Sequence, residues 1–463
     1  MASGSSPSVS SAKPEKFSAA GLRSLLDAEI ADPLQASYCV AFSGGADSTA
    51  LLAAMAELAS GASGLKLRAF HVDHGLYPES ARWAARAREA CGSIGVACTI
   101  ERVRVDTRVG VSVEASARAA RYASLARAIR ADEILLTAHH VDDQLETVLL
   151  QLARGAGVAG LAAMPANAPF GAGRHVRPLL GVSHDALLEY LSLRRLEWFD
   201  DPMNADLRFD RGFLRATVIP TLRKRWPAIA ANAARSARHM ADAQRLLDSL
   251  AERDWTRARD GSRLDLAGLA GIGGERALNL LRYWIRHEGR PLPSAHNLDR
   301  LLAMMTQAAG DSTPRVHWPG TDVRRYRGRL YIAESHELPD VPGVQWDWRR
   351  DSRLELGAGL GTLILAEGRG AGALARLRLP QSLVIRGDPA GAALRPAPDA
   401  RRRTLRNLFQ EHGVVPWVRG HIPLLYAGKD LVAVGDLWTE ATYQPQGDEP
   451  AVHIHWRGRP ELY

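Results

Sequence analysis

Cysteine is scarce in this chain of 463 residues, which contains only Cys39, Cys91 and Cys98 and no CxxC pair. A disulfide framework, a zinc ribbon or an iron–sulfur cluster requires paired or clustered cysteines, so the sequence argues against all three. The cysteines lie in or beside apolar segments, and we expect them to be core residues. Histidine pairs occur, but none comes with further ligands at the spacing of a zinc site.

Long hydrophobic runs are also missing. No apolar run approaches the roughly 20 residues that a membrane-spanning helix needs. Residues 1–16 are rich in Ser, Ala and Pro and lack an apolar stretch. We therefore predict a disordered tail over residues 1–20, a cytoplasmic protein and no membrane partner.

The chain lacks the Walker sequence GxxxxGK[ST], whose lysine contacts the β- and γ-phosphates of a nucleotide. We therefore do not expect γ-phosphoryl transfer. Residues 155–160 match the dinucleotide fingerprint GxGxxG, but they follow a predicted helix instead of a strand. They cannot form the strand-to-helix phosphate turn of that fingerprint, and we predict a flexible loop.

Negative charge is missing from residues 211–238, which contain seven Lys and Arg side chains and no carboxylate. A solvated helix face normally mixes both signs, so a run of one sign predicts phosphate contacts. A formal net charge of +8 and a sequence pI near 9.6 agree with a polyanionic partner. The basic residues assigned to these contacts are Arg211, Arg215, Lys224 and Arg225, with Arg402 and Arg403 nearer the C-terminus.

Residues 38–52 are typical of a buried strand, a small-residue turn and the start of a helix. The glycines of the turn let backbone N–H groups approach a ligand, and the helix presents its positive end, so the turn can cradle a phosphate or pyrophosphate. Asp47 is placed to hold a metal ion or a reacting amine. The alternative is an ordinary turn with a serine cap. The turn residues are Ser43, Gly44, Gly45, Ala46, Asp47 and Ser48.

Predicted strands and helices alternate from residue 38 to about residue 195. This alternation predicts an α/β fold with a doubly wound parallel sheet, whose ligands bind beyond the carboxyl ends of its strands. His71, His74 and Gly75 lie at one such end, and His139 lies at another. After the first strand we expect strands at 67–72, 96–103, 133–137 and 175–180, and helices at 79–94, 113–130, 141–154 and 183–195.

Two of these helices carry paired charges. Arg118 and Arg121 are three residues apart, so they share a helix face and can reach one anion. An ordinary solvated basic face is the alternative. Asp143 and Glu146 share a face in the first turns of the next helix, where paired carboxylates suit an ammonium group or a metal ion.

The second half of the chain differs in composition. Residues 227–335 show the leucine spacing of helices, whereas beyond residue 340 glycine, proline and short strands prevail. The chain is too long for one ordinary core. We therefore expect a tail at 1–20, a catalytic domain at 21–215, a mainly helical domain at 216–340 and a small C-terminal α/β domain at 341–463.

Residues 43–48 resemble the SGGxDS loop of the PP-loop ATP pyrophosphatases, which cleave ATP to AMP and pyrophosphate. A narrower resemblance links the chain to the bacterial tRNA(Ile)-lysidine synthetases. That family usually has asparagine where Gly212 stands, so any contact of that side chain is not carried over. The motifs are HVDHGL at 71–76, ARxxRY at 117–122, AHHxDDQxET at 138–147, DDPMN at 200–204 and RGFLR at 211–215.

The resemblance implies a Rossmann-like PP-loop domain that ligates L-lysine to C2 of the wobble cytidine in a CAU-anticodon isoleucine tRNA, forming lysidine. ATP would adenylate the cytosine O2 and release pyrophosphate, and lysine would then expel AMP. Poor leaving groups are activated in this way before an amine attacks. The helical and C-terminal domains would bind the tRNA.

The implied cofactors are ATP and Mg²⁺. Residues 43–48 with His71, His74 and Gly75 would bind ATP, and Asp47 would hold Mg²⁺ or accept a proton. Asp47, Asp143 and Glu146 are the expected catalytic residues. The lysine or the cytidine would contact Arg118, Arg121, His139, Asp143 and Glu146.

Two alternatives stay open: another PP-loop tRNA-modifying enzyme, such as a thiolase, and a non-catalytic RNA-binding protein on the same scaffold. Sulfur transfer needs a reactive cysteine or an iron–sulfur cluster, and the absence of a CxxC pair argues against a thiolase. A non-catalytic protein on a degenerate scaffold predicts a damaged loop, whereas every element of the loop is intact. The sequence leaves the oligomeric state open, with a homodimer among the choices.

Overall fold

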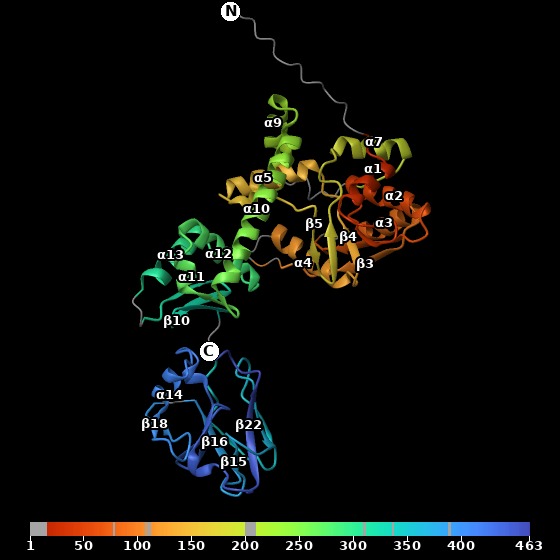
Figure 1. The fold of residues 1–463 in the computed structure, drawn as a ribbon. Coiled ribbons are helices and arrows are strands. Elements are labelled where there is room, and N and C mark those ends of the chain that lie inside the picture. The colour runs from red at the N-terminus through yellow and green to blue at the C-terminus, as the bar shows by residue number, and fades with distance from the viewer. Residues whose placement is uncertain are drawn as a thin grey trace, which may run out of the picture. The chain divides into compact units, whose positions relative to one another are not determined.

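The computed structural model describes residues 16–76, 79–106, 108, 113–199, 210–308, 312–335, 338–387 and 390–463. The chain forms two compact units, Met1–Leu247 and Asp248–Tyr463 (Figure 1). Most of the predicted tail and the DDPMN motif lie outside the described residues, while helix α1 (Ala19–Asp27) starts inside the tail range and is capped by Ser18. The domain boundaries after residues 215 and 340 remain a prediction.

The first unit is built on a six-stranded sheet with the order β3-β2-β1-β4-β6-β5. All neighbouring strands pair in parallel except β5, which forms an antiparallel hairpin with β6. The predicted doubly wound parallel sheet is therefore confirmed, and the edge strand β5 was not predicted. The strands are β1 (Ser37–Ala41), β2 (Lys66–Asp73), β3 (Cys98–Arg102), β4 (Glu133–Leu136), β5 (Asn167–Phe170) and β6 (Gly173–Val176).

Helices cover both faces of this sheet (Figure 1). On one face Tyr38 and Val40 of β1 pack against α1, α2, α3 and α7, whereas Cys39 packs on the other face with Leu125 of α4. Alternate side chains of one strand thus fill two separate cores, as expected for a buried strand. The helices are α2 (Ala46–Ser60), α3 (Ser80–Ser93), α4 (Val113–Ala128), α5 (Val141–Ala153), α6 (Val158–Leu161) and α7 (His184–Arg194).

The helical segment that carries the basic residues 211–238, called the basic segment below, packs against α5. Ile219, Ala230 and Ala233 form a small apolar core with Val141 and Leu145 of α5. This packing places the basic segment beside the helix that carries Asp143 and Glu146. The segment comprises α8 (Asp210–Phe213), a π-helix (Leu214–Val218), α9 (Ile219–Arg225) and the long α10 (Ile229–Ala258), which continues into the second unit.

The second unit starts with the predicted helices, but an antiparallel sheet with the order β7-β8-β11-β10-β9 accompanies them. Trp284 and Leu330 lie in one core that joins helices and sheet. The sheet was not predicted, because its strands are short and rich in arginine. The elements are α11 (Leu266–Ala270), α12 (Gly274–His287), α13 (Ala295–Gln307), β7 (Arg259–Asp260), β8 (Arg263–Asp265), β9 (Arg315–Trp318), β10 (Thr321–Tyr326) and β11 (Arg329–Ala333).

Among its described residues, the C-terminal part is an antiparallel β structure with one short α-helix, α14 (Leu405–Glu411), and two 3-10 turns. Its two larger sheets have the orders β12-β16-β19-β20-β21 and β13-β14-β22-β15 and enclose one large apolar core. Within the described ranges, no helix is long and apolar enough to span a membrane. The strands are β12 (Val344–Trp346), β13 (Arg353–Glu355), β14 (Thr362–Glu367), β15 (Leu374–Ala375), β16 (Leu383–Arg386), β17 (Ala393–Leu394), β18 (Arg403–Thr404), β19 (Leu424–Ala427), β20 (Asp430–Val434), β21 (Trp438–Thr439) and β22 (Ala451–Arg457).

Candidate active site

The glycine turn after β1 forms a compact loop at the N-terminus of α2. The Ser48 hydroxyl accepts the N–H groups of Ser43 and Gly44, at 3.3 and 3.2 Å. Gly44 has φ +88° and packs so closely on the Phe199 ring that a Cβ would overlap it, so only glycine fits there. The loop N–H groups therefore converge at the positive end of α2, where an anionic oxygen can replace the serine hydroxyl as acceptor.

A cavity of about 620 Å³ opens beyond the carboxyl ends of β1, β2 and β4. This is the edge of the sheet at which the sequence predicted the ligand. The cavity brings together most of the predicted site residues, whereas Gly44 and Gly75 do not line it. The predicted residues on its wall are Ser43, Gly45, Ala46, Asp47, Ser48, His71, His74, Arg118, Arg121, His139, Asp143, Glu146, Arg211 and Arg215.

The HVDHGL segment supports the wall of this cavity. Burial lowers the pKa of His71, and its Nδ1 lies 2.9 Å from the Phe42 carbonyl oxygen, so the neutral ring donates there and ties β2 to the loop after β1. The N–H of Gly75 donates to Asp73 Oδ1 at 2.8 Å, and Gly75 has φ +61°. His71 and Gly75 thus shape the turn, and their contact with ATP stays a prediction.

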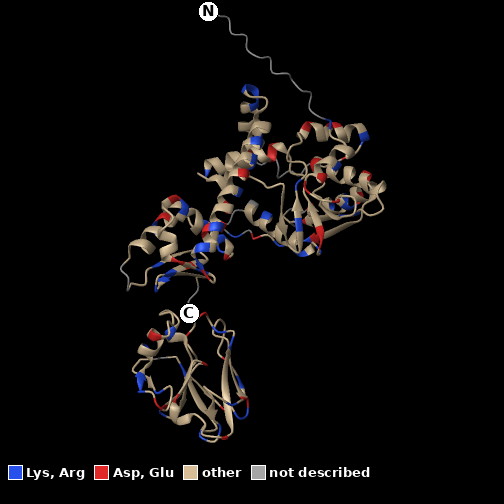
Figure 2. Cartoon of the chain, viewed as in Figure 1, with Lys and Arg blue, Asp and Glu red and all other residues tan. Residues whose placement is uncertain are grey.

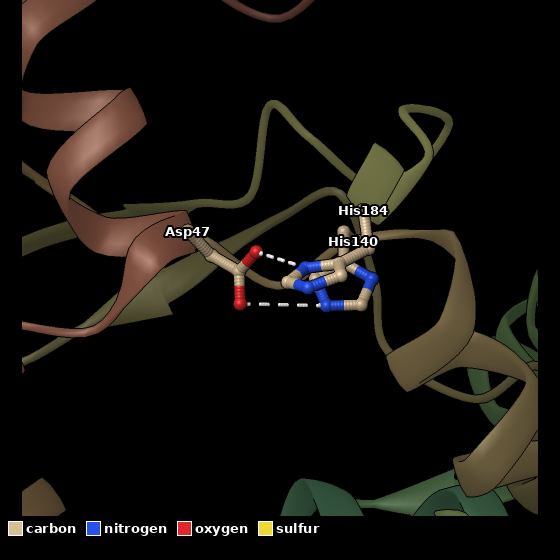
Figure 3. Close-up of side chains that lie close together, drawn as sticks. All are labelled: Asp47, His140 and His184. Atoms are coloured by element: carbon tan, nitrogen blue, oxygen red, sulfur yellow. Dashed lines mark hydrogen bonds and ion pairs between the residues drawn. The ribbon is translucent and has the colours of Figure 1, made fainter. Parts of the chain in front are cut away.

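Asp47 faces two imidazole rings (Figure 3). Its Oδ1 lies 2.8 Å from Nδ1 of His184, and its Oδ2 lies 3.5 Å from Nε2 of His140. Burial alone would raise the pKa of Asp47, but the hydrogen bonds from both histidines hold it well below its usual value. His184 was not predicted, because it is 137 residues from Asp47 and belongs to no motif.

The surroundings of Asp47 do not suit Mg²⁺. That ion takes oxygen ligands in an octahedral arrangement, whereas the cluster offers one carboxylate and two imidazoles. Burial alone would lower the pKa of His140, but Asp47, Asp143 and Asp142 raise it to about 9, so the charged ring faces Asp47 as a donor through Nε2. The contacts favour a hydrogen-bonded Asp47 over a metal-bound one.

The carboxylates of α5 are paired with arginines of the basic segment. Arg215 donates through Nε and Nη2 to both oxygens of Glu146, and its Nη2 also lies 3.0 Å from Asp143 Oδ1. Arg211 approaches Glu146 to 3.8 Å, and Arg223 pairs with Asp142. Burial raises the pKa of Glu146 although Arg215 offsets part of the effect. Arg211 and Arg215, predicted to contact tRNA phosphates, thus lie on the cavity wall.

The predicted arginine pair also lies on the cavity wall, on α4. The Cζ atoms of Arg118 and Arg121 lie 4.9 and 5.5 Å from the centroid of the Tyr122 ring. Burial lowers the pKa of Arg121, which reflects the cost of keeping this charge away from water. Both guanidinium groups line the cavity, so they can share one anion as predicted.

Four basic residues predicted to contact tRNA lie outside this cavity. Lys224 and Arg225 are exposed in the last turn of α9, where Figure 2 shows basic residues. Arg402 is exposed and donates to the Ala393 carbonyl at 3.2 Å, and Arg403 pairs with Glu411.

Known proteins resemble the chain over almost its full length. Family matches are the PP-loop domain at residues 22–222, the TilS substrate binding domain at 264–331 and the TilS substrate C-terminal domain at 383–456. Among solved structures, the U34-tRNA thiolase NcsA from Methanococcus maripaludis is 16% identical over 48% of this chain and 78% of its own, with a TM-score of 0.41.

Three full-length relatives are tRNA(Ile)-lysidine synthases. The protein of Coxiella burnetii is 38% identical over 89% of this chain and 91% of its own length, and that of Alkalilimnicola ehrlichii is 40% identical over 87% and 90%. The protein of Serratia proteamaculans is 39% identical over 93% of this chain and 98% of its own length. The PP-loop is intact and lies at the predicted cavity, and these three relatives match almost the whole chain. The chain therefore belongs to the tRNA(Ile)-lysidine synthase family.

Proposed function

We propose that this enzyme joins the side-chain amine of L-lysine to C2 of the wobble cytidine in isoleucine tRNA with a CAU anticodon, using ATP. One observation carries the proposal: the anion-binding loop, the arginine pair and the carboxylate pair face one cavity. Adenylation of a ring oxygen needs a pyrophosphate site, and amine attack needs a site for a cationic nucleophile. The cavity offers residues of both kinds.

In the proposed reaction the cytosine O2 attacks the α-phosphorus of ATP, and pyrophosphate leaves into the cradle at residues 43–48. The lysine amine, after losing a proton, then adds to C2 and expels AMP. Arg118 and Arg121 would offset phosphate charge, because guanidinium groups bind phosphate oxygens in a bidentate manner. Asp47, held ionised by His140 and His184, would supply negative charge beside the reacting groups, because its strongly lowered pKa makes it too weak a base to accept the amine proton.

Asp143 and Glu146 are the proposed site for lysine. In the structure their charge is balanced by Arg215, so a lysine ammonium group would share these carboxylates with Arg215 or displace it. This arrangement suits a cationic substrate, because both carboxylates already bind the positively charged side chain of Arg215.

Mg²⁺ would accompany ATP, held mainly by phosphate oxygens, since the Asp47 cluster is rich in imidazole. The exposed basic residues Lys224, Arg225, Arg402 and Arg403 are proposed phosphate contacts. A tRNA substrate, ATP and free lysine together indicate the cytoplasm as the compartment.

The test is incubation of the full-length enzyme with ATP, radiolabelled lysine and a CAU-anticodon isoleucine tRNA transcript, followed by nucleoside analysis. We expect a labelled nucleoside that depends on both ATP and tRNA, with AMP and pyrophosphate as products. A methionine tRNA with the same anticodon is the matched control and should stay unlabelled. Release of ADP in place of AMP, or no labelled nucleoside, would overturn the proposal.

A further inference from the structure

Four side chains that lead from the cavity wall into the protein interior form an unbroken hydrogen-bonded chain. Nη2 of Arg177 lies 3.0 Å from Nδ1 of His175, and Nε2 of His175 lies 2.8 Å from the Thr137 hydroxyl. That hydroxyl lies 2.8 Å from Nδ1 of His139, the ring that lines the cavity. Arg177, His175 and Thr137 are buried.

The sheet register explains why these residues meet. β4 and β6 pair in parallel, with Leu136 opposite Val176, and Thr137 follows β4 directly. The N–H of Thr137 donates to the Val176 carbonyl at 3.3 Å, which continues the pairing by one residue. The His175 ring also packs against Tyr122 and Phe170, with ring centroids 6.0 and 5.4 Å away. The orientation of His175 is therefore determined by packing as well as by hydrogen bonds.

Arg177 determines the direction of every hydrogen bond in the chain. A guanidinium group only donates, so Nδ1 of His175 must accept. A neutral imidazole carries one proton, which then lies on Nε2 of His175 and is donated to Thr137. The Thr137 hydroxyl, having accepted this bond, directs its own proton to Nδ1 of His139.

The reverse direction is unfavourable. If Nδ1 of His139 donated to Thr137, the buried hydroxyl proton would lack a partner among the described residues, because its two contacts would both be donors. A buried donor without a partner loses its hydrogen bond to water and gains none in the protein, so this arrangement is disfavoured. The neutral state of both rings agrees with this, since burial lowers the pKa of His139 and of His175 to about 3.

We propose that His139 acts as a fixed hydrogen-bond donor through Nε2–H to an acceptor atom of the substrate, and that Thr137, His175 and Arg177 are positioning residues that hold this tautomer. Nε2 of His139 has no hydrogen-bond partner in the described part of the chain, and the ring is partly exposed to the cavity. A preorganised donor of this kind stabilises charge that develops on an acceptor. His139 is accordingly neither the general base nor a metal ligand.

The identity of the acceptor rests on the proposed function. Two substrate groups have the required chemistry, namely the O2 and N3 atoms on the edge of cytosine and the phosphate oxygens of ATP. Both present lone pairs and no proton. The two sources can be separated, because ATP binds in assays without tRNA.

The first experiment observes the tautomer directly. Full-length protein labelled with ¹⁵N-histidine is studied by NMR, and the signals are assigned by their loss in His139→Gln and His175→Gln. We expect both rings to be neutral and protonated at Nε2. A proton on Nδ1 of His139, or rapid averaging between tautomers, would overturn the proposal. This measurement needs no substrate, so it stands even if the proposed reaction is wrong.

The second experiment breaks the chain at Thr137. Thr137→Val removes the hydroxyl with little change in shape, and Thr137→Ser keeps it. We expect Thr137→Val to lose the single-tautomer signal and to lower kcat for tRNA-dependent AMP release roughly 10–100-fold, the range seen when the partner that orients a metal-binding histidine is removed. Thr137→Ser should retain both. Equal activity and equal tautomer signals in the two variants would overturn the positioning role, with thermal unfolding as the check on folding.

The same variants identify the acceptor. Weaker ATP binding by Thr137→Val without tRNA would assign the donor to a phosphate oxygen. Unchanged ATP binding with a lower rate of tRNA adenylation would assign it to the cytosine edge. Both results support the donor role, whereas unchanged ATP binding with unchanged adenylation contradicts it.

Discussion

The guanidinium group of Arg215 lies against the buried carboxylate of Glu146, with Nη2 3.0 Å from Oε2 and a second contact from Nε to Oε1. Only 1% of the Glu146 side chain is exposed, compared with 39% of the Arg215 side chain. A residue of the basic segment thus neutralises a carboxylate inside the cavity, and the pair links the stability of the segment to the proposed lysine site.

Removal of the Arg215 charge should destabilise the protein. Arg215→Met leaves Glu146 buried without its bidentate partner, and we expect a loss of about 1–3 kcal/mol in the free energy of unfolding. Adding Glu146→Gln should recover part of that loss, because the side chain at position 146 is then uncharged and only Asp143 still lacks the Arg215 contact. Denaturant unfolding measures both. Arg211→Met is the control, since Arg211 approaches Glu146 only to 3.8 Å, and an equal loss there would contradict the prediction.

The glycine loop should be required for pyrophosphate release. Asp47→Asn and Ser48→Ala should fold and bind tRNA but lower tRNA-dependent pyrophosphate release about 10²–10³-fold, as expected when one preorganised group is lost. Ser93→Ala, at an exposed serine in α3, is the control and should behave as wild type. Full activity of both loop variants would exclude the loop from the mechanism.

Lysine selection should depend on α5. Asp143→Asn or Glu146→Gln should raise the lysine concentration needed for half-maximal rate, whereas pyrophosphate release in the absence of lysine should persist. A charge-assisted hydrogen bond of this kind contributes about 1.5–3 kcal/mol, or roughly 10–150-fold in affinity. The two half-reactions are measured separately. A fall in adenylation with unchanged lysine dependence would reassign the pair to ATP.

The ion pair between Arg68 and Glu133 should make stability depend on pH. Both contacts measure 2.6 Å, and 5% of the Glu133 side chain is exposed. Burial alone would raise the pKa of Glu133, but the hydrogen bonds from Arg68 outweigh it and lower the pKa. The folded pKa is depressed, so the stabilisation is present above the unfolded value of about 4.3 and is lost as the pH falls through the folded pKa.

Arg68→Met should therefore cost about 3–5 kcal/mol at pH 7, as for other buried pairs with one partner removed. The difference from wild type should shrink as the pH falls, because Glu133 is protonated first in the variant, where burial without Arg68 raises its pKa, and in wild type only below its depressed folded pKa. Denaturant unfolding at several pH values measures this. A difference that grows toward low pH would contradict the assignment.

The exposed basic residues should contribute phosphate contacts that are independent of sequence. Arg402→Ala and Lys224→Ala should each weaken the binding of isoleucine tRNA and methionine tRNA equally. Each should also reduce the slope of log binding constant against log salt concentration by roughly 0.7–0.9. Filter binding over a range of salt concentrations measures the slope. Arg369→Ala, whose arginine pairs with Asp448, is the control. A loss confined to isoleucine tRNA would instead indicate a specificity contact.

The sequence by itself determined the family, the glycine loop and the edge of the sheet at which the cavity lies. Residues 43–48 form a local motif, and alternating strands and helices build a parallel sheet whose carboxyl ends share one edge. The cavity brings Asp143, Glu146, Arg118 and Arg121 together, and the roles assigned to them stay predictions.

Only the tertiary structure decided which of these groups pair. His184 reaches Asp47 across 137 residues, Arg215 reaches Glu146 across 69, and Thr137 contacts His175 through the register of β4 and β6. The unpredicted sheet of β7 to β11 arises in the same way, since its short strands gain stability only from their neighbours. Local patterns carry backbone preferences, whereas partners distant in sequence are chosen by packing.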